Sequence, residues 1–301
     1  GTLPPEWSGM NSSLTMIRSE GCNFKGTIPE EWSSFRNKLT TLDLSQSFEL
    51  TGPIPSWVFE ENDVLINFKC SNCSLTGKGL ENDKVSAPEL MTLELENNQL
   101  TGTINPALGT GAPKLALLLL PGNDLSGPIP NTLGNLSIFI ANDNQLTGTI
   151  PARLFESPLL SVVSLAANAL TGTIPESVRH SNTLESFVLR QNLLTGTIPA
   201  LLFSNPNLDE VELAQNAFSG EMPNIDIDHK LSSLSLSSNV LSGTIPRNFF
   251  GLSDLELVHL DRNFLSCEVE MAESPATLLP KMVETNASKS ALSVLTGNVL
   301  G

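Results

Sequence analysis

The sequence is poor in side chains that catalyse reactions or bind nucleic acid. Its 301 residues include no tyrosine, only 3 histidines and 5% aromatic residues, so few groups are present for acid–base chemistry. Lysine and arginine number 16, against 32 aspartates and glutamates, which gives a formal net charge of -16. Because phosphate backbones and anionic membranes are bound by clustered positive charge, both are poor candidates for a partner.

Long hydrophobic runs are also missing. The longest apolar run, from Leu115 to Leu120, is far shorter than the roughly 20 residues of a membrane-spanning helix. Gly1 does not begin a charged-then-apolar signal sequence. We therefore expect any segment that exports or anchors the protein to lie outside this chain. The hydrophobic share of 40% still suffices for a buried core.

A short motif recurs along nearly the whole chain. The string Leu-Thr-Gly-x-Ile-Pro, or a close variant, begins at Phe24, Leu50, Leu75, Leu100, Leu125, Leu146, Leu170, Leu194, Phe218, Leu241 and Leu265. The average spacing is about 24 residues, and the pattern LxxLxLxxNxL precedes each occurrence, as at residues 160–170. A fixed period of this length indicates a solenoid built from about eleven repeats.

Each part of the repeat predicts a local structure. The alternating Leu-x-Leu segment predicts a short strand, and neighbouring repeats stack these strands into a parallel sheet. The recurrent Asn predicts a turn whose buried backbone groups its amide satisfies. Gly permits a tight turn, and Pro ends strand pairing before a short helical or irregular return. The third residue after Pro is predicted to be core: Trp32, Val58, Leu133, Leu154, Val178, Leu202 and Phe249, with Trp7 also assigned to the core.

These motifs resemble the plant-type leucine-rich repeat, whose signature is the LTGxIP half-repeat. Proteins with this signature are similar to receptor-kinase ectodomains, polygalacturonase-inhibiting proteins, and protist and algal surface proteins. The resemblance implies an α/β solenoid, right-handed and curved, with a parallel inner sheet and short helical or irregular convex segments. It also implies an extracellular or cell-surface location and a role in recognition.

The predicted solenoid covers residues 1–267, and residues 268–301 form a candidate C-terminal cap or tail. The chain opens inside a repeat, because residues 1–7 match the half-repeat at 26–32. A solenoid needs its open ends covered, so we expect a partner or a further segment at this end.

The four cysteines are predicted to be free thiols. Cys22 and Cys73 occupy the asparagine position of repeats two steps apart, and Cys70 occupies an inward strand position. Two strand spacings of roughly 4.8 Å exceed the reach of a disulfide between Cys22 and Cys73. All three are expected to be buried, whereas Cys267 is the one expected to pair outside the chain. Candidate glycan acceptors, in Asn-x-Ser sequons, are Asn11, Asn72, Asn135 and Asn286.

Outward positions of the predicted strands form a candidate binding surface. When equivalent outward positions are compared from repeat to repeat, those of the central repeats are apolar. They are Leu117, Leu119, Ile138, Ile140, Val162 and Val188, with Ala166 and Ala167 beside them. Acidic residues border them at Glu94, Glu96, Glu210 and Glu212, and Arg190 is expected to be a lone cation near the centre. An exposed apolar patch with a charged rim is typical of an interface.

The hypothesis that follows is a noncatalytic module that binds a protein, peptide or glycan through this concave face. No cofactor is expected. One alternative is an ice-binding or matrix-structural protein that uses the threonine columns of the TGT motifs, such as Thr149 and Thr173. Another is a secreted inhibitor of a cell-wall-degrading enzyme.

An enzyme is disfavoured by the placement of the titratable residues. His180 and His229 fall in connecting segments and His259 on the concave face, each expected to be exposed and without a catalytic partner. Asp226 and Asp228 share a face, but two carboxylates are too few for a calcium cage. The paired ligand spacing of a zinc site is not found either.

Overall fold

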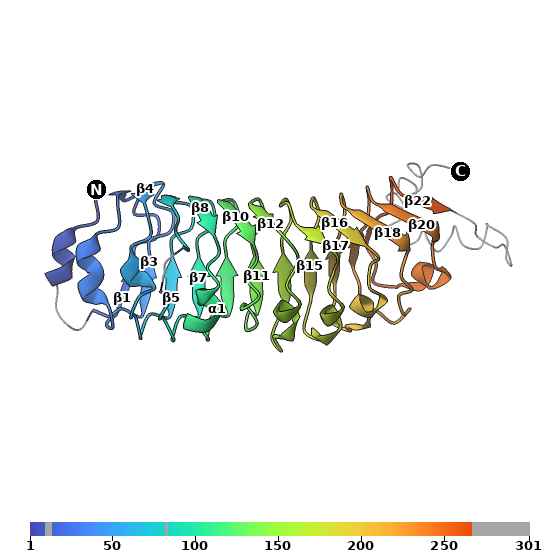
Figure 1. Ribbon diagram of the computed structural model, residues 1–301, viewed down its shortest axis with the longest axis horizontal. Coiled ribbons are helices and arrows are strands. Elements are labelled where there is room, and N and C mark those ends of the chain that lie inside the picture. The colour runs from blue at the N-terminus through green and yellow to red at the C-terminus, as the bar shows by residue number, and fades with distance from the viewer. Residues whose placement is uncertain (10–13, 82–83, 267–301) are drawn as a thin grey trace. The chain divides into compact units, whose positions relative to one another are not determined.

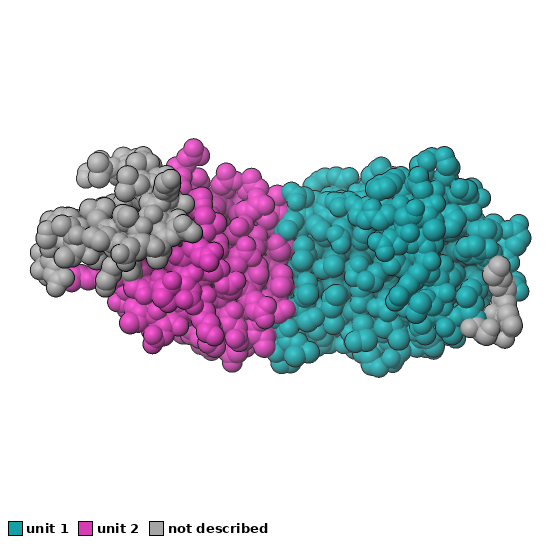
Figure 2. Space-filling model, turned by 180° about the vertical axis from the view of Figure 1, so that it is seen from behind, with its two compact units in different colours: residues 1–160 teal, residues 161–301 magenta. Residues whose placement is uncertain are grey.

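The computed structural model describes residues 1–9, 14–81 and 84–266 (Figure 1). The chain divides into two compact units, residues 1–160 and 161–301 (Figure 2). Both units repeat one step, in which a short strand, a turn, a second short strand and a return segment follow each other. The predicted leucine-rich-repeat solenoid is thereby confirmed as the fold class. One continuous array over residues 1–267 stays a prediction, and Asn11, Asn286, Cys267 and the tail lie outside the described residues.

Unit 1 contains two parallel sheets, formed by the odd-numbered and the even-numbered strands. The first sheet has β1 (Met16–Arg18), β3 (Thr41–Asp43), β5 (Asn67–Lys69), β7 (Thr92–Glu94), β9 (Leu117–Leu119) and β11 (Ile138–Ile140). The second has β2 (Lys25–Gly26), β4 (Glu49–Gly52), β6 (Ser74–Gly77), β8 (Gln99–Thr103), β10 (Asp124–Pro128) and β12 (Gln145–Thr147). Return segments include η1 (Pro5–Gly9), η2 (Glu30–Phe35), η3 (Ser56–Val58), α1 (Ala107–Gly111) and η4 (Ala152–Glu156).

Unit 2 repeats this arrangement. Its first sheet has β13 (Val162–Ser164), β15 (Ser186–Val188), β17 (Glu210–Glu212), β19 (Ser233–Ser235) and β21 (Leu257–His259). Its second sheet has β14 (Thr171–Gly172), β16 (Leu193–Gly196), β18 (Ala217–Glu221), β20 (Val240–Thr244) and β22 (Phe264–Ser266). Return segments are η5 (Glu176–His180), η6 (Ala200–Ser204) and η7 (Arg247–Gly251). All segments labelled η are 3-10 helices.

The core lies between the two sheets and the return segments of each unit. The middle residue of the first-sheet strands points inward, as Leu118 and Phe187 do with no exposed surface. Residues three after each Pro are buried as predicted, from Trp32 at 0% to Phe249 at 8% exposure. Trp7 is only half-buried, because it lies in the first return segment and stacks against Trp32 from one side.

An asparagine ladder joins neighbouring repeats, as predicted. In unit 1, the Asn123 amide donates to the carbonyl oxygens of Leu95 at 2.9 Å and Leu120 at 3.0 Å, and its oxygen accepts the Leu100 N–H at 3.1 Å. In unit 2, Asn192 makes the same set of bonds. Since these amides are buried, each satisfies backbone groups that the turn would otherwise leave unpaired.

The Thr-Gly-Thr segment has a packing role that explains its recurrence. Gly196 has a φ of 80°, which disfavours residues with a Cβ. A Cβ there would also lie 2.7 Å from the methyl carbon of Thr173, which stands in the preceding repeat. Thr103 and Gly127 repeat this relationship in unit 1. In these repeats, the second Thr of the motif covers the Gly of the next repeat.

Candidate binding surface

Four aliphatic side chains adjoin on the outer face of the first sheet in unit 1. In the register of β9 and β11, Leu117 lies beside Ile138 and Leu119 beside Ile140. All four are half-buried, while the residues between them, Leu118 and Phe139, point into the core. We call Leu117, Leu119, Ile138 and Ile140 the aliphatic block. It spans one strand spacing, about 4.8 Å, by two residues, roughly 6.6 Å.

An acidic border adjoins the aliphatic block. Glu94 of β7 lies in register with Leu119, and its carboxylate pairs with Lys69 of β5 at 2.8 Å. The pKa of Glu96, two residues further on, is raised above its ordinary value, first by burial and then by the neighbouring Glu94 charge. The Lys69 partner was predictable, because it stands one repeat length before Glu94 in the same outward column.

The residues predicted for the apolar patch in unit 2 present little apolar surface. Val162 is half-buried, but Val188 is only 9% exposed and Ala166 only 1% exposed. The sequence pattern identified Val188 as outward-facing correctly but not as covered. The predicted apolar patch is therefore reduced in unit 2 to Val162, with Ala167 half-buried beside the turn.

Charged and polar groups of unit 2 are paired with each other. Arg190 forms an ion pair with Glu212 at 3.0 Å, so the prediction of a lone cation is wrong. Glu212 lies opposite Val188 in the register of β15 and β17. Glu210 accepts a hydrogen bond from the hydroxyl of Ser186 at 2.6 Å.

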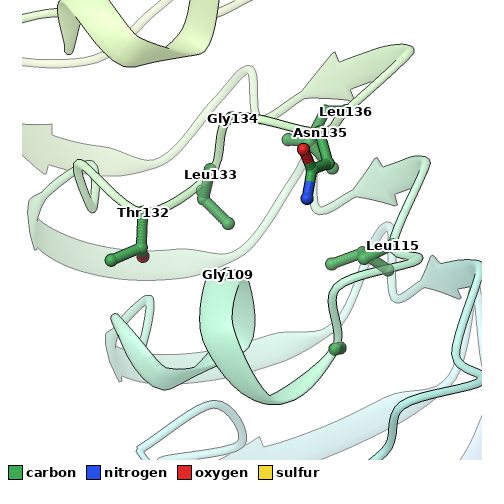
Figure 3. A pocket seen from close by; sticks show the side chains of 8 residues that line it. Gly109, Leu115, Thr132, Leu133, Gly134, Asn135 and Leu136 are labelled. Atoms are coloured by element: carbon green, nitrogen blue, oxygen red, sulfur yellow. The ribbon is translucent and has the colours of Figure 1, made fainter.

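A cavity of about 10 Å³ lies between α1 and residues 132–136 on the return side of unit 1 (Figure 3). It is lined by Leu115, Leu133 and Leu136, and Asn135 lies at its edge. This volume matches a single water molecule rather than a substrate. Asn135 is exposed, and its amide donates to the carbonyl oxygen of Pro113 at 3.0 Å.

One of the three histidines has a different environment from the one predicted. His229, expected to be exposed, is buried: its Nε2 lies 2.9 Å from the Asn205 carbonyl oxygen and its Nδ1 accepts the Leu231 N–H at 3.1 Å. Burial lowers its pKa, while Asn205 and Asp226 act in the opposite direction. In the part of the chain that the structure describes, no group of three His, Cys, Asp or Glu residues could hold a metal ion.

The threonine columns are partly engaged in structure. The hydroxyl of Thr195 donates to the carbonyl oxygen of Gly172 in the preceding repeat at 3.3 Å. Ser219 and Ser126 make equivalent bonds at 3.4 and 3.3 Å. Thr149 and Thr173 are exposed. The second sheet thus offers hydroxyl groups and methyl groups to solvent, with part of the hydroxyl donors already used.

The cysteines are free thiols in the described residues, as predicted, but they differ in exposure. Cys70 and Cys73 are buried, whereas Cys22 is exposed, contrary to the prediction. Cys22 takes the asparagine position of its repeat. Asn72, between the two buried cysteines, is half-buried and accepts a hydrogen bond from Asn97 at 2.9 Å.

Comparisons with known proteins agree with this fold. A family model described as Leucine Rich Repeat matches residues 89–110 and 230–252. A search of curated protein sequences finds no match. The chain is therefore a leucine-rich-repeat solenoid that resembles the plant type.

Several solved structures are similar over most of this chain. The ectodomain of the plant membrane receptor kinase GASSHO1/SCHENGEN3 from Arabidopsis thaliana, in complex with CASPARIAN STRIP INTEGRITY FACTOR 2, is 29% identical over 88% of this chain and 32% of that one, with a TM-score of 0.78. The plant peptide hormone receptor RGFR1, in complex with RGF2, is 29% identical over 88% and 46%, with a TM-score of 0.76. This chain spans less than half the length of either receptor chain.

A plant ice-binding protein is 25% identical over 81% of this chain and 80% of that chain, with a TM-score of 0.62. The ice-binding protein is therefore closer in length to this chain than the two receptor chains are. Among the described residues, no helix has the length and apolar character needed to cross a membrane.

Proposed function

We propose that this chain is a noncatalytic recognition module that binds an extended peptide or protein segment at the aliphatic block. The observation that carries the proposal is the register of β9 and β11, which brings four half-buried aliphatic side chains together on an outer sheet face. Polar side chains normally occupy such positions, as Asn67 and Lys69 do on β5. A contiguous apolar area in this place is best explained by a partner that covers it.

The acidic border defines the chemistry of the partner. The block is wide enough for one aliphatic or aromatic side chain, which would lose its contact with water there. Glu96 is partly desolvated beside Glu94, so a cation from the partner would relieve an unfavourable charge arrangement. The partner is therefore expected to carry an apolar side chain close to a lysine or arginine.

The similar receptor structures support a peptide or protein partner, since two of them are complexes with the ligands that their descriptions name. The same similarity supports an extracellular or cell-surface location. The contribution of Val162, Val188, Arg190, Glu210 and Glu212 in unit 2 to binding remains a prediction. A glycan partner and the inhibition of a cell-wall-degrading enzyme remain predictions.

Peptide selection tests the proposal directly. The intact chain is immobilised and presented with a random linear peptide library, and selected peptides are titrated against a Leu119→Glu, Ile140→Glu double variant. A matched control carries Leu193→Glu and Leu201→Glu, at two exposed leucines outside the block. Circular dichroism confirms that each variant folds.

We expect the selected peptides to share an apolar residue next to Lys or Arg. Their affinity should fall about 30-fold on the double variant, which corresponds to the loss of an interface anchor worth about 2 kcal/mol. The control should bind as the parent does. Equal binding to the double variant, or a failure to select any peptide, would contradict the proposal.

Ice binding is a second candidate function, and one observation favours it: a plant ice-binding protein is similar over 80% of its own length. The exposed Thr149 and Thr173 would belong to the ice-contacting surface. Thermal hysteresis that disappears in a Thr149→Tyr, Thr173→Tyr variant would support this function. The absence of hysteresis in the parent chain would reject it.

A further inference from the structure

Two cysteine side chains meet beneath the turn that follows β5. The Sγ atoms of Cys70 and Cys73 lie 2.9 Å apart, and both side chains are buried, with 0% and 7% exposure. A disulfide has an S–S length of about 2.05 Å, so the two sulfurs are within 1 Å of bonding distance. They also lie in one peptide segment, three residues apart.

Cys73 occupies a position that asparagine fills elsewhere in the ladder. One repeat later, the Asn98 amide donates to the carbonyl oxygens of Cys70 at 2.8 Å and Leu95 at 3.0 Å. The Cys73 sulfur lies 3.5 Å from the Leu44 carbonyl oxygen and 3.8 Å from that of Ser71, and it also contacts the Cys70 sulfur and the backbone of Ser47. Since a thiol is a weak donor, this position serves the ladder poorly.

Neighbouring hydroxyl groups show the same deficit. The buried side-chain oxygens of Ser47 and Ser71 have no hydrogen-bond partner in the part of the chain that the structure describes. The turn is therefore less well satisfied than the asparagine turns around it.

The two thiols are not equivalent. The hydrogen bond from Cys70 lowers the pKa of Cys73, and the same contact together with burial raises the pKa of Cys70. Cys73 is also the less buried of the two. Because an incoming disulfide must reach the sulfur that attacks it, the less buried Cys73 is the residue suited to this attack.

We propose that Cys70 and Cys73 form a redox-active dithiol, which small-molecule disulfides such as oxidised glutathione convert into an intramolecular disulfide. The Cys73 thiolate attacks one sulfur of oxidised glutathione, forms a mixed disulfide and releases one glutathione thiolate. Cys70, as its thiolate, then attacks the Cys73 sulfur, closes the Cys70–Cys73 bond and releases the second glutathione. Two protein thiols are oxidised and one glutathione disulfide is reduced to two glutathione thiols.

Trypsin separates the relevant cysteines for the test. Cleavage after Lys69 and Lys78 releases residues 70–78, which contain both buried cysteines, and cleavage after Arg18 and Lys25 releases residues 19–25 with Cys22. The protein is produced in a reducing cytosol, incubated folded with oxidised glutathione, quenched with acid, alkylated in denaturant and digested. Exposed Cys22 is the internal control for the oxidant.

We expect residues 70–78 to become lighter by two hydrogen atoms and to resist alkylation, while residues 19–25 carry glutathione. A Cys70→Ser variant should retain glutathione on Cys73, and a Cys73→Ser variant should leave Cys70 unmodified. Two alkylated thiols in residues 70–78 after Cys22 has reacted would overturn the proposal. Equal glutathione on both variants would overturn the assigned order of attack.

Formation of the Cys70–Cys73 bond is measured on the unsubstituted protein. The main result therefore does not depend on whether the variants fold. If the circular dichroism spectrum shows that a serine variant is unfolded, the corresponding Cys70→Ala or Cys73→Ala variant replaces it. A folded, oxidised parent should also melt at a higher temperature than the reduced parent, by ~2–6 °C, because the crosslink restricts the unfolded chain.

Discussion

The side-chain amide of Asn123 donates to the carbonyl oxygen of Leu95, in the preceding repeat, at 2.9 Å. The same amide also bonds within its own turn, and its oxygen accepts a backbone N–H of the preceding repeat. One buried side chain therefore holds two consecutive repeats together. The ladder supplies a specificity that the nondirectional burial of leucine cannot supply.

Asn123→Ala should destabilise unit 1 by about 2–4 kcal/mol, because buried carbonyl and N–H groups lose their partners. Urea denaturation followed by circular dichroism measures the change. Asn131→Ala, at an exposed position after Pro130, should cost less than about 0.5 kcal/mol. Equal effects of the two substitutions would mean that the ladder bonds add nothing to stability.

Gly196→Ala should cost more than Gly21→Ala. Both glycines have positive φ angles, 80° and 72°. Each alanine should therefore lower the free energy of unfolding by about 1 kcal/mol, because its side chain disfavours the left-handed backbone. Only at Gly196 does the added carbon also meet a neighbour, the methyl group of Thr173, which adds about 1–3 kcal/mol of overpacking. A Thr173→Ser change should recover part of that excess in a double-mutant cycle. Additive effects would exclude the contact.

Acidification should destabilise unit 2 through His229. Its pKa is lowered from the ordinary value of 6.5, so the folded state favours the neutral ring. The resulting stability is fully present above the unfolded pKa and is lost as pH falls through the folded pKa. Protonation would also place a hydrogen on Nδ1, which accepts the Leu231 N–H.

His229→Gln provides the comparison, because glutamine offers a donor and an acceptor without titrating. Between about pH 8 and pH 5, the melting temperature of the parent should fall more steeply than that of the variant. His180→Gln and His259→Gln, at exposed positions, should follow the parent. Parallel curves for the parent and His229→Gln would refute this role.

Glu96→Gln should stabilise unit 1 slightly at neutral pH. The raised pKa of Glu96 means that its contribution to stability is present below the unfolded pKa and is lost as pH rises through the folded pKa. The gain should stay below about 1 kcal/mol, since solvent screens this half-exposed carboxyl group. Glu94→Gln should give no gain, because it breaks the ion pair with Lys69. Thermal melts of both variants distinguish these outcomes.

The repeat architecture was predictable because periodic signals add over eleven repeats. Strand positions, the asparagine ladder and the buried return residues all follow from one motif, so a local error in one repeat changes nothing. Exposure at single positions was less predictable. Val188 is outward by periodicity, yet it is only 9% exposed, and a repeat period does not specify the conformations of the side chains around it.

Isolated substitutions in the motif were the hardest to interpret. Cys22 and Cys73 take the same place in the repeat, but one is exposed and the other is buried against Cys70. His229 was assigned to a loop, and its burial depends on Asn205, one repeat earlier, whose carbonyl oxygen meets its ring.

The most direct test of the aliphatic block is a methyl NMR titration with a selected peptide, using isoleucine δ-methyl labelling of the intact chain. The methyl groups of Ile138 and Ile140 should shift or broaden as the peptide is added, while that of exposed Ile227 stays unchanged. A peptide that binds with unchanged Ile138 and Ile140 signals would contradict the account and place the binding surface elsewhere on the chain.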